Sequence, residues 1–122
     1  MLLSSLRHVL LVEDEILISL DVEAALLNAG VHAFTRVAST ADALKAIRTH
    51  QPDAVILDIA VLDGSTARVA DLLRSMSIPF MLYTGSGVQG DSVSFEGAKF
   101  LEKPACDADL VRAVRALTVA PL

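Results

Sequence analysis

Short apolar runs alternate along the chain with longer stretches in which apolar and polar residues are mixed. Runs of this length, bounded by turn-forming residues, are typical of buried strands. The predicted strands cover residues 9–12, 32–37, 54–57, 80–83 and 100–102. The stretches between them predict helices over 16–29, from Ser39 or Thr40 to 50, over 66–76 and from Asp107 to about 117. Alternating strands and helices favour βαβ units, so we expect an α/β fold with a mostly parallel sheet.

Polar residues follow the predicted strands at the point where each strand ends. Glu13 and Asp14 follow the first strand, Asp58 the third, Thr84 the fourth and Lys103 the fifth. Because the carboxyl ends of parallel strands meet at one edge of a sheet, we expect these side chains to converge. Three carboxylates there would hold a divalent cation such as Mg²⁺. The cation and Lys103 would neutralise a phosphoryl group, Thr84 would donate a hydrogen bond to it, and Asp58 would be the nucleophile.

Each of these residues also has a purely structural interpretation. Glu13, Asp14 and Glu15 would suit the N-terminus of the following helix, where negative charge is favourable. Asp58 would suit the start of a turn, and Lys103 would suit an exposed surface. The occurrence of all of them at the ends of strands favours the chemical interpretation.

Composition bounds the class of protein. The chain has 122 residues, 53% of them hydrophobic, which is enough for one core, and we expect residues 1–122 to form a single domain. Its net charge of -5 without a basic cluster argues against direct nucleic-acid binding. The only cysteine is Cys106, which fits a reducing compartment. No apolar run is long enough to cross a membrane, so we expect a soluble, cytoplasmic protein.

The motifs Glu13-Asp14, Asp58, Thr84-Gly85 and Lys103-Pro104 resemble those of the receiver domains of two-component response regulators. The resemblance covers essentially the whole chain. It implies a doubly wound, flavodoxin-like (CheY-like) fold: a five-stranded parallel sheet in the order 2-1-3-4-5 with five flanking helices.

The same resemblance implies a role for each motif residue. Asp58 would be the phosphoacceptor, and it would bind Mg²⁺ together with Glu13, Asp14 and the backbone carbonyl of Ala60. Lys103 would contact the phosphoryl group. The residues that would move on phosphorylation are Thr84 and Phe100, and the Lys103–Pro104 peptide bond would be cis.

The chain departs from the family pattern in two segments. The segment of residues 60–64 is shorter than in the family and contains no proline. Between the fourth and fifth strands, a helix is disfavoured by four glycines: Gly85, Gly87, Gly90 and Gly97. We therefore expect a short or irregular fourth helix around residues 91–95. The sequence of residues 80–85 is similar to that of an alphaproteobacterial subgroup of receivers, whose fourth strand ends Phe-Ala-Thr-Gly. Receivers of this subgroup often stand alone.

The expected function is a phosphorylation-dependent switch rather than an enzyme with an external substrate. A sensor histidine kinase or phosphotransfer protein would supply the phosphoryl group, and the output would be contact with a downstream protein. One alternative is a degenerate receiver used as a binding scaffold. An aspartate-nucleophile phosphatase would need a second acid where Ala60 stands, and a flavodoxin-like nucleotide-binding module would need a phosphate loop after the first strand.

The first predicted helix carries two apolar stripes. One contains Ile18, Val22, Ala25, Leu26 and Ala29, and the receiver resemblance implies that it faces the sheet. The other, here called the α1 stripe, contains Leu17, Leu20, Ala24 and Leu27, with the spacing of a helix–helix contact. The α1 stripe either packs under neighbouring loops or the last helix, or docks a kinase or a second copy of the chain as a homodimer.

Overall fold

The computed structural model describes residues 6–85 and 93–118 and contains a five-stranded parallel sheet. Its strands are β1 (His8–Val12), β2 (Ala33–Val37), β3 (Ala54–Leu57), β6 (Phe80–Thr84) and β7 (Lys99–Glu102). They lie in the order β2-β1-β3-β6-β7. Counted along this sheet alone, the order is 2-1-3-4-5, which confirms the predicted fold class.

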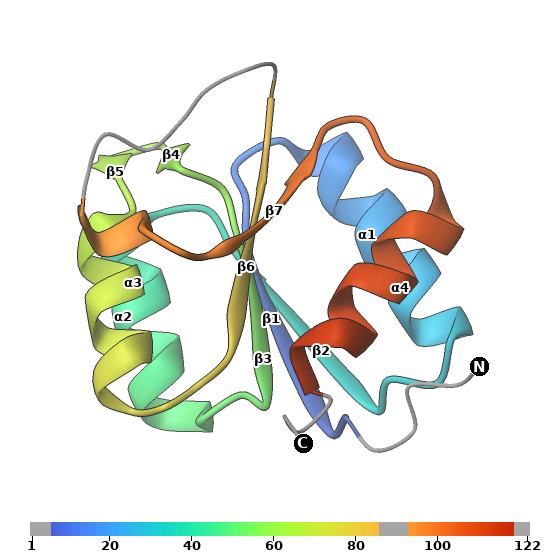
Figure 1. Ribbon diagram of the computed structural model, residues 1–122, viewed down its shortest axis with the longest axis horizontal. Coiled ribbons are helices and arrows are strands. Elements are labelled where there is room, and N and C mark those ends of the chain that lie inside the picture. Colours follow the sequence, from blue (N-terminus) through green and yellow to red (C-terminus); the bar gives the residue numbers. More distant parts are fainter. Residues whose placement is uncertain (1–5, 86–92, 119–122) are drawn as a thin grey trace.

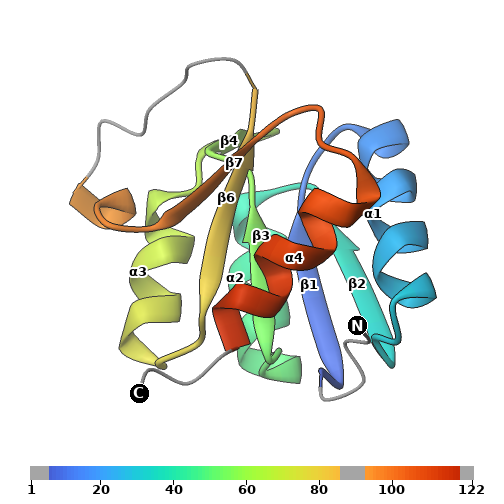
Figure 2. The ribbon, with the colours of Figure 1, turned by 45° about the vertical axis from the view of Figure 1, so that its right-hand side comes forward.

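The helices form two layers, one on each face of the sheet (Figures 1 and 2). Helices α1 (Ile16–Asn28) and α4 (Asp107–Thr118) cover one face, and α2 (Thr40–His50) and α3 (Ala67–Ser75) cover the other. The side chain of Ser39 accepts a hydrogen bond from the N–H of Asp42, so Ser39 rather than Thr40 caps α2. Within the described residues, no helix is long and apolar enough to cross a membrane.

The core has two halves because β1, β3 and β6 are apolar on both faces. Every residue of β3 is buried, which is what a central parallel strand requires. Leu10, Val55 and Leu82 pack with α2 and α3, whereas Leu11 and Met81 pack with α1 and α4. The alternation along each strand therefore divides the apolar side chains between the two helical layers.

A small antiparallel hairpin was not predicted from the sequence. Strands β4 (Ala60–Val61) and β5 (Gly64–Ser65) form it, between the end of β3 and the start of α3. Gly64 has a φ of 110°, which a side-chain-bearing residue rarely adopts. Two-residue strands carry no detectable apolar period, so only the Asp63-Gly64 turn was visible in the sequence.

The segment after β6 contains a short 3-10 helix, η1 (Val93–Phe95), where receivers would have a fourth helix. This confirms the prediction of a short or irregular helix for residues 93–95, while residues 86–92 lie outside the described part of the chain. Phe95 is buried in the core beside α3. Arg74 of α3 donates hydrogen bonds to the backbone carbonyls of Ser94 and Glu96, so a side chain ties this segment to α3.

Helix α1 presents its faces as the resemblance implied. Val22, Ala25 and Leu26 are buried, and the neighbouring Ser19 is buried with its hydroxyl donating to the carbonyl of Glu15. All members of the α1 stripe are exposed: Leu17 (74%), Leu20 (52%), Leu27 (43%) and Ala24. The expected outward position of the stripe is therefore confirmed, and none of the described elements covers it.

We predict that the free energy of unfolding decreases as the pH is lowered, because two histidines lie close together at the amino end of the sheet. The rings of His8 and His50 lie 5.2 Å apart, and burial together with the charge of His50 lowers the pKa of His8. The unfolded chain then binds the proton more tightly than the folded one, so stability is lost as pH falls below about 6.5. Urea unfolding between about pH 7.5 and pH 5.5 measures this loss.

The variants His8→Gln and His32→Gln separate this effect from general acid destabilisation. His32 is exposed and lies outside the His8–His50 pair, so His32→Gln is the control variant. His8→Gln flattens the dependence because no proton is taken up at that position on unfolding. An unchanged slope in His8→Gln would contradict the assignment.

Candidate functional site

The sheet register places the polar strand ends side by side. Val12 pairs with Leu57 in the register of β1 and β3, so the next residues, Glu13 and Asp58, lie at the same level. The N–H of Lys103 donates to the carbonyl of Thr84 across 2.8 Å, which brings the end of β7 to the end of β6. The predicted convergence at the carboxyl edge of the sheet is therefore present.

Glu13, Asp14 and Asp58 form an acidic cluster, with one carboxylate oxygen of each lying within 4.8 Å of the others. Glu13 is fully buried, Asp14 is half-buried and Asp58 is 9% exposed. Crowding like charges in a buried site is unfavourable unless positive charge compensates them. The acidic cluster therefore requires a cation, and the structure supplies one in Lys103.

The ammonium of Lys103 bridges two members of the acidic cluster. Its Nζ lies 2.5 Å from Oε1 of Glu13 and 2.8 Å from Oδ2 of Asp58, and Oε1 of Glu15 lies 3.7 Å away. Burial by itself would lower the pKa of Lys103, but the hydrogen bonds and charges of Asp58 and Glu13 outweigh burial and raise it. Lys103 is thus held as a cation at the centre of the site.

The pKa of Glu13 shows that a negative charge at this buried position is unfavourable. Burial raises its pKa, and the hydrogen bonds from Lys103 and from the N–H of Glu15 offset only part of the effect. Its Oε2 accepts the N–H of Glu15, and the ammonium of Lys103 is the contact of its buried Oε1 among the described residues. Because Glu13 points inward, it does not cap α1; the residue at the cap position is Glu15, whose side chain makes no capping bond.

The loop after β3 fixes Asp58 through its backbone. Oδ1 of Asp58 accepts the N–H of Ile59 at 2.7 Å, and Oδ2 accepts Lys103. The buried hydroxyl of Thr66 donates to the carbonyl of Asp58 at 2.6 Å, so the start of α3 holds this loop. The carboxylate is therefore oriented from both sides and keeps a partly exposed surface.

Three positioning residues carry no signal in the sequence. Thr66 anchors the Asp58 loop, and Nε of Arg36 on β2 donates to the carbonyl of Glu13 at 3.0 Å. The hydroxyl of Tyr83 accepts the N–H of Ala105, just after Lys103. Each contact joins segments whose proximity depends on the assembled sheet, so no spacing in the sequence indicates it.

The remaining predicted site residues lie on strands β4, β6 and β7. Thr84 is the buried last residue of β6, and Phe100 lies opposite Leu82 on β7 with 46% of its surface exposed. Ala60 is exposed at the start of β4, two residues after Asp58. The Lys103–Pro104 peptide bond is cis, as expected. The switch roles of Thr84 and Phe100 and the metal-binding role of the Ala60 carbonyl remain predictions.

The donor set fits a hard divalent cation. Mg²⁺ binds oxygen ligands and commonly uses only a few carboxylates of the protein. The acidic cluster offers oxygens from three carboxylates, and the buried Oε1 of Glu13 has the Lys103 ammonium as its contact among the described residues. The cluster therefore resembles the magnesium site of receiver domains.

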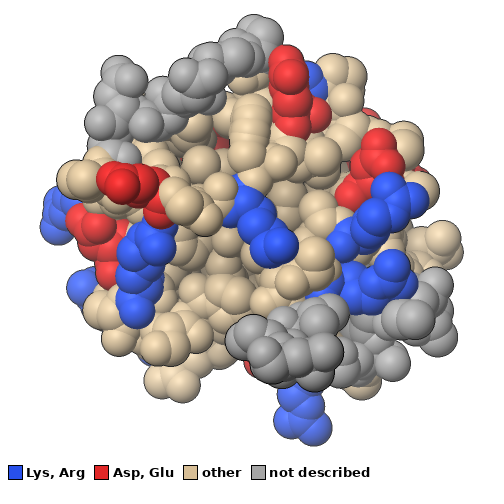
Figure 3. All heavy atoms as spheres, viewed as in Figure 1, with Lys and Arg blue, Asp and Glu red and all other residues tan. Residues whose placement is uncertain are grey.

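Charges of both signs are interspersed on the molecular face that Figure 3 shows, with a broad uncharged area between them. This distribution differs from the continuous basic field of a nucleic-acid-binding surface.

Comparison with known proteins shows likeness to receivers. SdrG from Sphingomonas melonis Fr1 is 32% identical over 96% of this chain and 100% of SdrG, with a TM-score of 0.78. A response regulator receiver protein from Sinorhizobium medicae WSM419 is 28% identical over 91% of this chain and 93% of its own, with a TM-score of 0.76. The chemotaxis response regulator CheY4 of Vibrio cholerae shares the fold at 23% identity, covering 91% and 98% of the two chains, with a TM-score of 0.78.

No family model matches the chain, and no curated protein matches it. The solved structures, the sheet order and the acidic cluster agree with one another. The chain belongs to the receiver domains of response regulators.

We predict that Asp14→Asn stabilises the protein in a chelating buffer. The substitution removes one of three crowded negative charges, which raises the free energy of unfolding by about 1 kcal/mol. Magnesium stabilises the unsubstituted chain by binding the folded state, and Asp14→Asn loses most of this gain. Thermal unfolding with and without Mg²⁺ measures both effects.

Asp21→Asn is the matched control because Asp21 is exposed on α1 outside the cluster. It keeps the stabilisation by magnesium and changes the metal-free stability by less than about 0.5 kcal/mol. Destabilisation by Asp14→Asn in chelator would contradict the account of crowded charge.

Proposed function

We propose that this receiver is a phosphorylation-dependent switch whose phosphoacceptor is Asp58. The observation that carries the proposal is the ammonium of Lys103, which bridges Asp58 and Glu13 within the acidic cluster. A partly exposed carboxylate beside a held cation is suited to accept a phosphoryl group and to stabilise its charge. Ala60, two residues beyond Asp58, offers only a methyl group and gives no support to a phosphatase with a second catalytic acid.

The reaction would transfer a phosphoryl group from a histidine of a kinase or phosphotransfer protein. A carboxylate oxygen of Asp58 forms the new P–O bond while the P–N bond to the imidazole breaks, and the imidazole leaves with its electron pair and takes up a proton. Glu13, Asp14 and Asp58 would hold Mg²⁺, which would supply charge neutralisation at the phosphoryl oxygens. Lys103 neutralises the same oxygens from the protein side, so the chain would promote its own phosphorylation without acting on other substrates.

The switch would then use Thr84 and Phe100. Thr84 lies at the end of β6, where its hydroxyl would donate to the phosphoryl group, and the exposed Phe100 would move with it. SdrG from Pseudomonas melonis Fr1, 31% identical to this chain, has been solved in a BeF3-activated conformation. We infer that this chain responds in the same manner, as a member of the alphaproteobacterial subgroup suggested by residues 80–85, and signals in the cytoplasm by contact with a downstream protein.

We predict that acetyl phosphate labels the chain with one phosphoryl group only when Mg²⁺ is present. Asp58→Asn abolishes the labelling because the amide cannot form the acyl phosphate. Intact-mass spectrometry measures the added group. Asp71→Asn on the exposed face of α3 is the control and is labelled like the native chain. Full labelling of Asp58→Asn would overturn the assignment of the phosphoacceptor.

The α1 stripe is the proposed docking surface for the phosphodonor or for a second copy of the chain. Three of its members are leucines that are between 43% and 74% exposed. Burying one such side chain in an interface contributes about 1.5–3 kcal/mol before the cost of association. The first member of the stripe, Leu17, follows the acidic residues closely in sequence, because α1 begins directly after Glu15.

We predict that Leu20→Glu combined with Leu27→Glu keeps the fold and the labelling by acetyl phosphate. The same variant loses about tenfold or more in the rate of transfer from the kinase that phosphorylates the native chain. If the stripe joins two copies instead, sedimentation shows the loss of the dimer. Leu62→Glu with Val93→Glu is the matched control, because both residues are exposed outside α1. Unfolding of the α1 variant would show that the stripe belongs to the core.

A further inference from the structure

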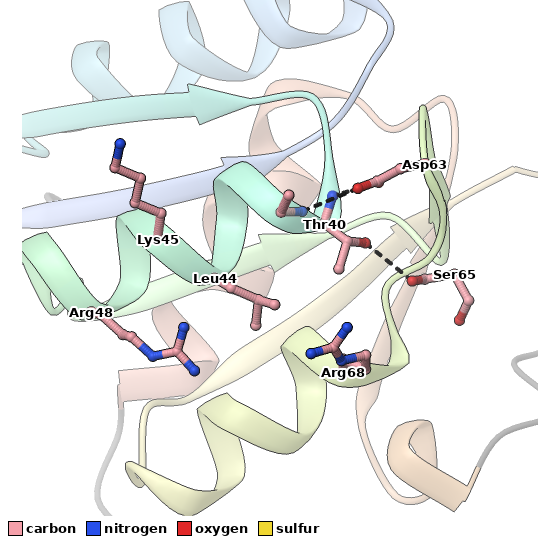
Figure 4. Close-up of a pocket in the computed structure, with 8 residues that line it drawn as sticks. Thr40, Leu44, Lys45, Arg48, Asp63, Ser65 and Arg68 are labelled. Atoms are coloured by element: carbon pink, nitrogen blue, oxygen red, sulfur yellow. Dashed lines mark hydrogen bonds between the residues drawn. The ribbon is translucent and has the colours of Figure 1, made fainter.

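A groove lies between α2, the start of α3 and the β4–β5 hairpin, on the opposite side of the sheet from the α1 stripe. Its volume is about 570 Å³, within the range of ligand-binding clefts. Figure 4 shows the guanidinium groups of Arg48 on α2 and Arg68 on α3 extending toward one another, with the side chain of Leu44 between the two helices. Lys45 extends in another direction. We call this the arginine groove.

The two arginines of the groove lack compensating charge. Among the described residues, neither Arg48 nor Arg68 makes an ion pair or a side-chain hydrogen bond, and both are exposed. This is notable in a chain with a net charge of -5, where acidic partners for an arginine are abundant. A planar guanidinium presents a fork of donors that matches a carboxylate or phosphate.

Among the described residues that line the groove, Asp63 is the one acidic residue, and its carboxylate already accepts hydrogen bonds. The two carboxylate oxygens of Asp63 accept the N–H groups of Thr40 and Ala41, at 2.6 and 3.1 Å. These bonds, that to Thr40 first, outweigh desolvation and lower the pKa of Asp63. Asp63 therefore compensates the N-terminus of α2 and leaves the arginines available to another anion.

We propose that the arginine groove docks an acidic segment of a partner protein. Carboxylates of that segment would pair with Arg48 and Arg68, and an apolar side chain between them would pack on Leu44, which is only half-buried. A phosphate ligand would favour free N–H groups at a helix N-terminus. Asp63 takes two of those groups at the start of α2, so the groove offers an anion the guanidinium groups on either side of the half-buried Leu44, an arrangement that suits carboxylates set around an apolar residue.

The test is a titration with the synthetic peptide acetyl-Glu-Glu-Leu-Leu-Glu-Glu-amide, followed by amide NMR of the isotope-labelled chain. Shifts confined to α2, the hairpin and the start of α3 are expected. Arg48→Gln combined with Arg68→Gln weakens binding about tenfold or more, because charge-assisted hydrogen bonds are lost. Replacing the glutamates or the leucines of the peptide by serine also weakens it.

Arg112→Gln with Arg115→Gln is the control, since it removes the same charge from α4 on the other side of the sheet. Unchanged peptide binding in this control supports the proposal that the peptide binds in the arginine groove. A loss of affinity equal to that of the Arg48/Arg68 variant would overturn the proposal, because the loss would then be a general effect of charge. Circular dichroism verifies the fold of each variant. The proposal also fails if the peptide shifts no amide around the groove, or if inorganic phosphate or ADP binds the same residues more tightly than the peptide.

Discussion

The crowding of three carboxylates at one edge of the sheet is the constraint on which the site depends. The acidic cluster brings their oxygens within 4.8 Å, and Glu13 is buried there with a raised pKa. Such a site persists only if positive charge stays within reach. Lys103 meets this requirement from the position directly after β7, the edge strand, so its ion pairs connect the end of the first strand of the chain with the end of the last. The arrangement stores electrostatic repulsion where a cation and a phosphoryl group would be received.

Several structural features serve to hold this charge in place. The register of β1 with β3 sets Glu13 beside Asp58, and the hydroxyl of Tyr83 accepts the N–H of Ala105 next to the Lys103–Pro104 turn. Arg36 donates to the carbonyl of Glu13 from β2, which flanks β1 on the side opposite to β3. The apolar halves of the core fix the strands to which these residues belong, so packing energy supports an unfavourable concentration of charge.

The sequence predicted those parts of the structure that follow from strand period and strand ends. Asp58 and Lys103 were recognised because parallel strands must bring their carboxyl ends together, and the exposure of Leu17 followed from the family resemblance. Arg36 and Thr66 could not be found in this way. Their roles depend on single hydrogen bonds between segments that become neighbours only when the sheet assembles.

The β4–β5 hairpin was also not predicted from the sequence. It lies between the Asp58 loop and the arginine groove. Its neighbour Thr66 donates to the carbonyl of Asp58, and the hydroxyl of Thr40 donates to the carbonyl of Ser65. Asp63 lies in the turn between β4 and β5 and accepts a hydrogen bond from the N-terminus of α2. Helix α2 forms one wall of the arginine groove. A displacement of the Asp58 loop must therefore stretch or carry along the hydrogen bonds that shape the groove. Two-residue strands are held by few bonds, so the hairpin is the least costly element between Asp58 and α2 to rearrange.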